Sequence, residues 1–444
     1  MTEVLEKQVI IPAHLEEEFD SLLNSTFSAE PVWLKGKRSA AFDAFSVKGI
    51  PGRKSEEYKY TDVKKIFSKH FTSVHNEQHT FKLDINKIQV DKDSIKLVFV
   101  NGWLYKDSTL SAELPEGVII GSMAADALFL HREVLEKYLG STIPDDADPF
   151  ALLNSTLWFD GAFIYIPEGV KLGKTIEIIH ISTGNEELLV SPRNLIIAEK
   201  NSESYIIEHS ISLDVKKHHI VNSLAEVVVG ENAHLSFYKI QSENQNISQL
   251  HNTFSTQGKK SVFDTCTVTI GSDWVRNNLT IAHYGEYCET HLNGLFITNG
   301  SQHIDNHTLV DHCLPNCQSN QLYKGILDDK STGVFNGKIF VRKDAQKTNA
   351  YQSSKNILLN DNATINTKPQ LEIYADDVKC SHGSSTGQID PDAMFYLRSR
   401  GLSEDSAKNL LMYAFAADAV NTIRIDSVKE FVDNLIAKRL NHPN

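Results

Sequence analysis

The sequence has few cysteines, an excess of acidic over basic residues and no long apolar run, and each shortage excludes a class of protein. Five cysteines in 444 residues is an odd and sparse count, so a disulfide framework is not expected and a reducing compartment is. The formal net charge of -13 disfavours a general nucleic-acid binder, which needs a basic surface, and an anionic membrane as partner. The longest apolar run near the end, LLMYAFAADAV, is too short to span a bilayer.

Two further signals are missing. The first residues, MTEVLEKQVIIPAHLEEEFD, have no basic start and no apolar core of signal-peptide length, so we expect a cytoplasmic protein. The segment GVKLGKT, residues 169–175, approximates a phosphate-binding loop, but its glycines are too close together. The segment after it, IEIIHIS, predicts a strand instead of the helix whose N-terminus would hold a phosphate. We therefore expect no nucleotide to be bound by this chain.

The hydrophobic pattern divides the chain into three regions. Residues 1–145 mix helical and strand signals, among them the helical face of HLEEEFDSLLNS and an amphipathic patch in SEEYKYTDVKKIF. Residues 146–378 contain many short β-rich runs bounded by Gly, Asn, Asp or Ser, with no convincing helix between them. Residues 379–444 are helical again. Asp390 and Pro391 have the pattern of a helix start, Gly401 that of its end, and two amphipathic helices follow.

The β-rich runs fit a sandwich, a barrel or a solenoid. Several of them do not alternate strictly between apolar and polar residues, which suits stacked coils that bury one face. The predicted fold class is therefore mainly β, with a parallel β-helix core flanked by an N-terminal α/β region and a C-terminal helical region. In the last helix, Ser427 and Glu430 have the spacing of a capping box.

A first candidate metal site is the segment HIDNHTLVDHCLPNC, which contains His303, His307, His312, Cys313 and Cys317. Imidazole and thiolate are good ligands for zinc or iron. The two cysteines, however, are spaced Cys-x3-Cys, and no matching second pair lies downstream. A polar strand edge with two buried thiols is the commoner explanation of such a segment.

A second candidate is the pair Cys380 and His382 in ADDVKCSHG. If this segment is extended, residues two apart share one face of the sheet, so the thiol and the imidazole project side by side. They could offer two ligands to one metal or cluster, but they cannot complete a four-ligand site alone. The alternative is a buried cysteine beside a hydrogen-bonded histidine.

Four segments resemble the SufB/SufD family, the β-helix subunits of the SUF scaffold for iron–sulfur cluster assembly. They are ADDVKCSHGSSTGQIDPDAMFYLRSRGLS, PFALLNSTLWFDGAFIYIPEGVKL, YKGILDDKSTGVFNGKIFV and SEEYKYTDV, and they are spread over most of the chain. The Cys-Ser-His-Gly sequence favours the SufD branch, because SufB has a glutamate before the corresponding histidine. The resemblance also strengthens the expectation of a parallel β-helix.

The resemblance implies a non-enzymatic scaffold subunit that supports iron acquisition and nascent cluster assembly. Such a subunit pairs with a SufB-like subunit through the β-helix and with a SufC-like ATPase through the C-terminal region. The family's interface histidine falls on His382, and the neighbouring cysteine falls on Cys380. The resemblance therefore makes both residues candidate contacts to a transient iron–sulfur cluster, or to iron, that is shared with SufB. His382 is the candidate metal ligand. Cys313 and Cys317 match no ligand motif of the family.

Several alternatives stay open at this point. The chain could be a purely structural scaffold whose His382 touches neither cluster nor iron. It could form a homodimer when SufB is absent. A β-helix carbohydrate-active enzyme is a third interpretation, against which stand the missing export signal and the lack of a convincing carboxylate constellation.

Overall fold

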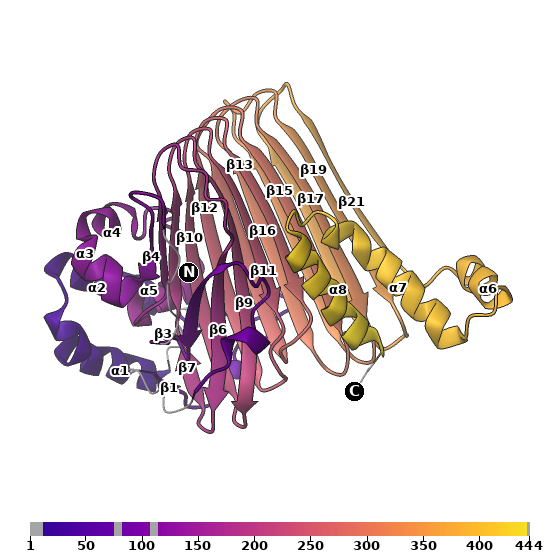
Figure 1. Cartoon of the computed structure of the whole chain (residues 1–444), viewed down its shortest axis with the longest axis horizontal. Coiled ribbons are helices and arrows are strands. Elements are labelled where there is room, and N and C mark those ends of the chain that lie inside the picture. The colour runs from indigo at the N-terminus through magenta and orange to yellow at the C-terminus, as the bar shows by residue number, and fades with distance from the viewer. Residues whose placement is uncertain (1–11, 75–81, 107–113, 442–444) are drawn as a thin grey trace, which may run out of the picture.

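The computed structural model describes residues 12–74, 82–106 and 114–441. The expectation drawn from the first residues concerns a segment that lies largely outside this part of the chain. At the centre are two large sheets whose strands are mostly parallel (Figure 1), with one helical group near each end of the stack. This arrangement confirms the predicted parallel β-helix core with flanking helical regions.

From residue 193 onward the strands alternate between the two sheets along the chain, so that each coil adds one strand to each sheet. His303 pairs with Thr332, 29 residues further on, and the register then continues without a slip over both strands. Sheet A consists, in spatial order, of β4 (Ile119–Ser122), β5 (Ala162–Ile166), β8 (Arg193–Ala198), β10 (His219–Val229), β12 (Ile247–Gln257), β14 (Trp274–His283), β16 (His303–His312), β18 (Thr332–Val341) and β20 (Thr364–Ile373). In addition, β7 (Leu188–Val190) pairs with β10, and β1 (Thr72–Ser73) pairs with β7.

Sheet B begins in the first region of the chain and ends beyond residue 378, so the solenoid extends past the expected core on both sides. Its strands, in spatial order, are β3 (Trp103–Leu104), β2 (Ile95–Val100), β6 (Ile176–Gly184), β9 (Glu203–Val215), β11 (His234–Gln241), β13 (Val262–Thr269), β15 (Glu289–Thr298), β17 (Gln318–Leu327), β19 (Asn349–Leu358) and β21 (Lys379–Gly387). The strand predicted after GVKLGKT is β6, which confirms that no helix follows this segment.

The space between the sheets is filled by inward-facing side chains of both. Ile281 and Val310 from sheet A pack with Phe263 and Leu292 from sheet B in one apolar cluster. The interior is not apolar throughout, because a buried polar cluster lies beside it, in which Glu208 is within 3.8 Å of Lys239 and 3.6 Å of His251. Burial of charged side chains is tolerated when each finds a partner of opposite sign.

The N-terminal region covers one outer face of sheet A. Phe150, Leu153 and Leu157 of α5 (Pro149–Leu157) pack with Ile220 and Leu250 of the sheet. The remaining helical elements of this region are α1 (Ala13–Asn24), η1 (Thr26–Ala29), α2 (Val32–Lys48), η2 (Glu56–Tyr58), η3 (Ile66–Ser68), η4 (Ile85–Lys87), the π-helical η5 (Met123–Ala127), α3 (Leu128–Leu130) and α4 (Arg132–Tyr138).

The amphipathic patch SEEYKYTDVKKIF forms short turns that lie across sheet A, and not a longer helix. Its Tyr58 ring lies 3.9 Å from the guanidinium carbon of buried Arg276, and Arg276 is paired with Asp305 at 2.7 Å. Thr61 donates a hydrogen bond to the same carboxylate at 2.5 Å. The buried Arg276–Asp305 pair thus holds this segment on the sheet.

Two of the C-terminal helices, α7 (Glu404–Val420) and α8 (Asp426–Asn441), cover the outer face of sheet B (Figure 1). The third, α6 (Pro391–Ser399), projects away from the sheets. The predicted start and end of α6 are confirmed: the Asp390 side chain accepts from the backbone amides of the first turn, and Gly401 has a positive φ of 95°. The predicted capping box is wrong, because α8 begins at Asp426 and Ser427 already lies inside its first turn.

Candidate functional site

Cys380 and His382 lie on β21, which ends sheet B. In the parallel register Cys380 is opposite Ala350 and His382 is opposite Gln352, and both of these β19 residues are buried inside the solenoid. Because paired residues in a parallel sheet stack directly over one another, Cys380 and His382 continue two inward-facing rows at the end of the stack. The structure therefore places the two side chains on one face, as the spacing predicted.

The two residues differ in their surroundings. Cys380 is half-buried against a small apolar cluster that includes Ile339, Ala350 and Ala375. Burial raises the pKa of the Cys380 thiol above its ordinary value, so this side chain by itself is not a ready thiolate. His382 is exposed, so its imidazole is open to a partner from outside the chain.

The end of the solenoid is uncovered. Within the described part of the chain, no strand pairs with the outer edge of β21 or of β20, and every residue of β21 except Cys380 is exposed. Figure 1 shows β21 as the last strand of its sheet, with α6 projecting away from it. The backbone N–H and C=O groups along such an edge are free to pair with another strand.

Polar groups near this end also lack partners. Buried side-chain oxygens of Asn349, Gln352 and Asn356, all on β19, have no hydrogen-bond partner among the described residues. Gln352 does donate through Nε2 to Gln321 at 2.8 Å, so its other end is the unsatisfied one. Leaving a buried acceptor unpaired costs free energy, about 1–3 kcal/mol. The interior beside the last coil is therefore incompletely hydrogen-bonded among the described residues.

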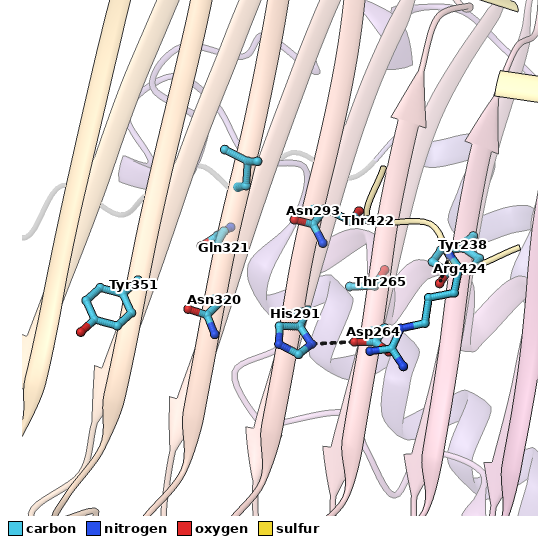
Figure 2. Close-up of a pocket in the computed structure, with 11 residues that line it drawn as sticks. Tyr238, Asp264, Thr265, His291, Asn293, Asn320, Gln321, Tyr351, Thr422 and Arg424 are labelled. Carbon is cyan, nitrogen blue, oxygen red and sulfur yellow. Dashed lines mark hydrogen bonds and ion pairs between the residues drawn. The ribbon is translucent and has the colours of Figure 1, made fainter. Parts of the chain in front are cut away.

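A second feature lies on the outer face of sheet B, where polar side chains line a groove of about 330 Å³. Figure 2 shows Asp264, His291, Asn320 and Tyr351 in a row across four strands, which agrees with their pairing in the sheet. Arg424, from the turn between α7 and α8, reaches the Asp264 carboxylate at 3.0 Å. The groove thus lies where the C-terminal helices meet the sheet.

Asp264 is the centre of an ion cluster in this groove. Its carboxylate oxygens lie 2.6 Å from His291 Nδ1 and 2.8 Å from His234 Nε2. Burial pushes the pKa of Asp264 upward, but hydrogen bonds to His234 and His291 and the charge of Arg424 outweigh it and hold the pKa well below its usual range. The hydrogen bond that His291 donates to the Asp264 carboxylate likewise raises the pKa of His291. The cluster ties the turn between the last two helices to the sheet.

The histidines of the first candidate metal site do not come together. His303 and His307 lie on the outer face of β16, where His303 stacks on Trp274 and His307 contacts Asp305 and Glu57. His312 is inside the solenoid, 3.2 Å from His283. Across the described ranges, no group of three or more His, Cys, Asp or Glu side chains has an arrangement that could hold a metal ion. Alternation along a strand sends neighbouring positions to opposite faces.

The groove on sheet B was missed by the sequence reasoning. Asp264, His291, Asn320 and Tyr351 are 27 to 31 residues apart, and this spacing equals one coil of the solenoid. The signal was present as a repeat of polar positions, but turns of unequal length between the strands obscured it.

Comparisons with known proteins agree with this geometry. Residues 14–178 match the model described as the SufBD protein N-terminal region, and residues 180–415 match the SUF system FeS cluster assembly, SufBD core domain. In the described part of the chain, no helix has the length and apolar character required to cross a bilayer.

Similar proteins match over nearly the full length. An iron-sulfur cluster assembly SufBD family protein of Synechocystis is 30% identical over 95% of both chains. The iron-sulfur cluster assembly protein SufD of Escherichia coli is 32% identical over 88% of this chain and 90% of its own. The SufD of Bacillus subtilis is 26% identical over 93% and 95%. The chain belongs to the SufBD family of the SUF iron–sulfur cluster assembly system.

Proposed function

We propose that the chain is the SufD-type scaffold subunit that pairs with a SufB-like subunit through the open end of its solenoid. The observation that carries this proposal is the uncovered coil formed by β20 and β21, whose outer strand edges are free among the described residues. An added strand would pair with the backbone groups along these edges. In the absence of SufB, the same end fits a second copy of this chain.

At that interface, His382 contacts iron or the nascent cluster. The imidazole is exposed and belongs to the row that continues from the solenoid interior. Neutral imidazole is a good ligand for iron, and thiolates are the common ligands of clusters. Because Cys380 and His382 are only two groups, the SufB-like subunit must supply the other ligands. The cluster is cargo in this proposal, and it leaves the complex once it is built.

The C-terminal region docks a SufC-like ATPase. The support is an outer surface on α6 and α7 that carries exposed apolar side chains, namely Phe395, Tyr396 and Leu410. Exposed apolar clusters of this kind mark protein interaction sites. Since GVKLGKT leads into a strand, we expect ATP to be bound and hydrolysed by the SufC-like subunit and not by this chain.

The test is His382→Ala in the complex of all three subunits. We expect the complex to assemble and its iron and sulfide content after anaerobic purification to fall, with a smaller fall for Cys380→Ala. Ser381→Ala is the matched control, because Ser381 is an exposed neighbour on the same strand whose side chain projects from the opposite face.

Gel filtration separates the possible outcomes. Unchanged iron and sulfide in an intact His382→Ala complex would contradict the cluster contact and leave a purely structural scaffold. Failure of the His382→Ala complex to assemble would show that the histidine acts in subunit pairing. Carbohydrate turnover by the pure chain would overturn the scaffold role itself.

A further inference from the structure

Two cysteines lie together at one corner of the solenoid. Cys288 ends the turn between β14 and β15, and Cys317 ends the turn between β16 and β17. The residues that follow them, Glu289 and Gln318, are paired in sheet B. Cys288 and Cys317 therefore occupy equivalent positions in adjacent coils.

The two sulfur atoms share one hydrogen-bond acceptor. The backbone carbonyl oxygen of Gly285 lies 3.2 Å from Cys288 Sγ and 3.2 Å from Cys317 Sγ. Both side chains are buried. Adjacent strands are about 4.8 Å apart, which falls inside the range of about 4.4–6.8 Å between the Cα atoms of disulfide-bonded residues. The backbone therefore needs little movement for the two sulfurs to bond.

We propose that Cys288 and Cys317 form a reversible dithiol–disulfide pair, a modification site that joins two adjacent coils covalently and takes hydrogen peroxide as its oxidant. The proposal is independent of the cluster-assembly role, because the coil that carries β19 separates Cys317 from the strand that carries His382.

The chemistry has a defined order. The hydrogen bond from the Cys317 thiol lowers the pKa of Cys288 and raises that of Cys317, so Cys288 ionises first. The Cys288 thiolate attacks one peroxide oxygen, the O–O bond breaks, and hydroxide leaves and takes up a proton to become water. The Cys317 sulfur then attacks the sulfenic acid, an S–S bond forms, and a second water is released. Two thiols and one peroxide thus give one disulfide and two waters.

The other cysteines provide matched controls. Cys313 is near this corner but contacts the Asp311 carbonyl oxygen at 3.7 Å, and burial raises its pKa to about 12. Cys266 is buried on the outer face of sheet B, where its thiol lies 3.9 Å from the Ala419 carbonyl oxygen of α7. We expect neither to take part in the disulfide.

The experiment is peptide mapping of the reduced full-length chain after treatment with hydrogen peroxide and alkylation of the remaining thiols. Trypsin is unsuitable, because no Lys or Arg lies between Arg276 and Lys324 and all three corner cysteines stay in one peptide. A protease that cleaves before aspartate separates Cys288 from the other two at Asp305 and Asp311. We expect the two peptides to be joined and a dithiol reductant to release them.

Single substitutions identify which cysteine is cross-linked to Cys288. Cys313→Ser and Cys266→Ser should keep the cross-link, whereas Cys288→Ser and Cys317→Ser should abolish it. Circular dichroism of the reduced variants checks the fold, and the wild-type peptide map does not depend on any variant. The proposal is overturned if Cys288 and Cys317 are recovered alkylated from the wild type, or if the cross-link survives Cys317→Ser.

Discussion

Glu243 is a carboxylic acid buried in the solenoid, held by side chains from both sheets. Ser182 of sheet B donates to it at 3.0 Å, Gln249 of sheet A donates to its other oxygen, and Ser272 donates at 3.3 Å. Burial raises the pKa of Glu243 to about 8, although these hydrogen bonds act in the opposite direction. The side chain is therefore mostly protonated at neutral pH.

This buried acid predicts a pH-dependent stability. In the unfolded chain its pKa returns to about 4.5, so the folded state holds the proton more tightly. The contribution of this proton to the stability of the folded state is complete below about pH 4.5 and is lost as the pH rises through about 8. The substitution Glu243→Gln removes the titrating carboxyl group and keeps the shape of the side chain. We expect the stability advantage of the variant over the wild type to grow between pH 5 and 8, by up to about 1.4 kcal/mol per pH unit.

Urea unfolding at several pH values measures the effect. Glu168→Gln is the matched control, because Glu168 lies in an exposed turn after β5. Parallel stability curves for Glu243→Gln and the wild type would mean that Glu243 is ionised in the folded chain.

At the scale of elements, α7 and α8 close the outer face of sheet B. Met412 and Ala416 of α7, with Val432 and Ile436 of α8, pack on an apolar stripe of the sheet that includes Leu295. Deletion of the chain after Gly401 would expose this stripe, so a truncation cannot separate partner docking from folding. Substitutions on the buried side and on the exposed side of these helices can test folding and docking separately.

We predict opposite effects for the buried and exposed faces of the C-terminal helices. Ile436→Ala should lower the free energy of unfolding by about 2–5 kcal/mol, because it leaves a cavity. Leu410→Arg, on the exposed side of α7, should leave stability unchanged and weaken capture of the SufC-like subunit. Urea unfolding and co-purification measure the two effects.

Two exposed side chains serve as controls for these variants. Lys438→Ala should not change stability, and Phe129→Arg, an exposed apolar side chain on α3, should not change capture. Full capture by the Leu410→Arg protein would argue against docking at this surface.

Local signals were sufficient to predict most of the elements. The cap at Asp390 and the β-rich runs depend on neighbouring residues, and these predictions are confirmed. The spacing of Cys380 and His382 predicted a shared face for the same reason. The ion cluster of Asp264 and Arg424 could not be predicted, because its members are far apart in sequence and meet only after the coils are in register. The predicted start of α8 at Ser427 was wrong by one or two residues, as is usual at helix ends.

At the scale of the whole molecule, the solenoid is a stack in which each coil contacts mainly its neighbours. Central strands such as β10 and β12 have a coil on both sides, whereas β20 and β21 have a neighbour on only one. In such stacks, stability is close to a sum of the coils and of the interfaces between neighbours. The last coil is therefore held by one interface fewer than the others.

This difference predicts a gradient of local opening. Amide hydrogen exchange should be fastest in β20 and β21 and slowest in the central strands. Adding the SufB-like subunit should slow exchange in β21 selectively, since its edge then becomes paired. Mass spectrometry of the peptides from each strand measures both effects. Equal exchange of β21 in the free chain and in the complex would argue against pairing at this end.

The two ends of the solenoid are unlike, and this limits how many copies can join. At the N-terminal end the direction of the strands reverses: β4 is antiparallel to β5 and β3 is antiparallel to β2. A stack with two free parallel ends would add copies head to tail and grow into a fibre. At the C-terminal end both sheets finish in a parallel strand, and in the proposed pairing two solenoids meet there. A third solenoid would have to join at the N-terminal end, where the outermost strands run antiparallel, so we expect the assembly to stop at two.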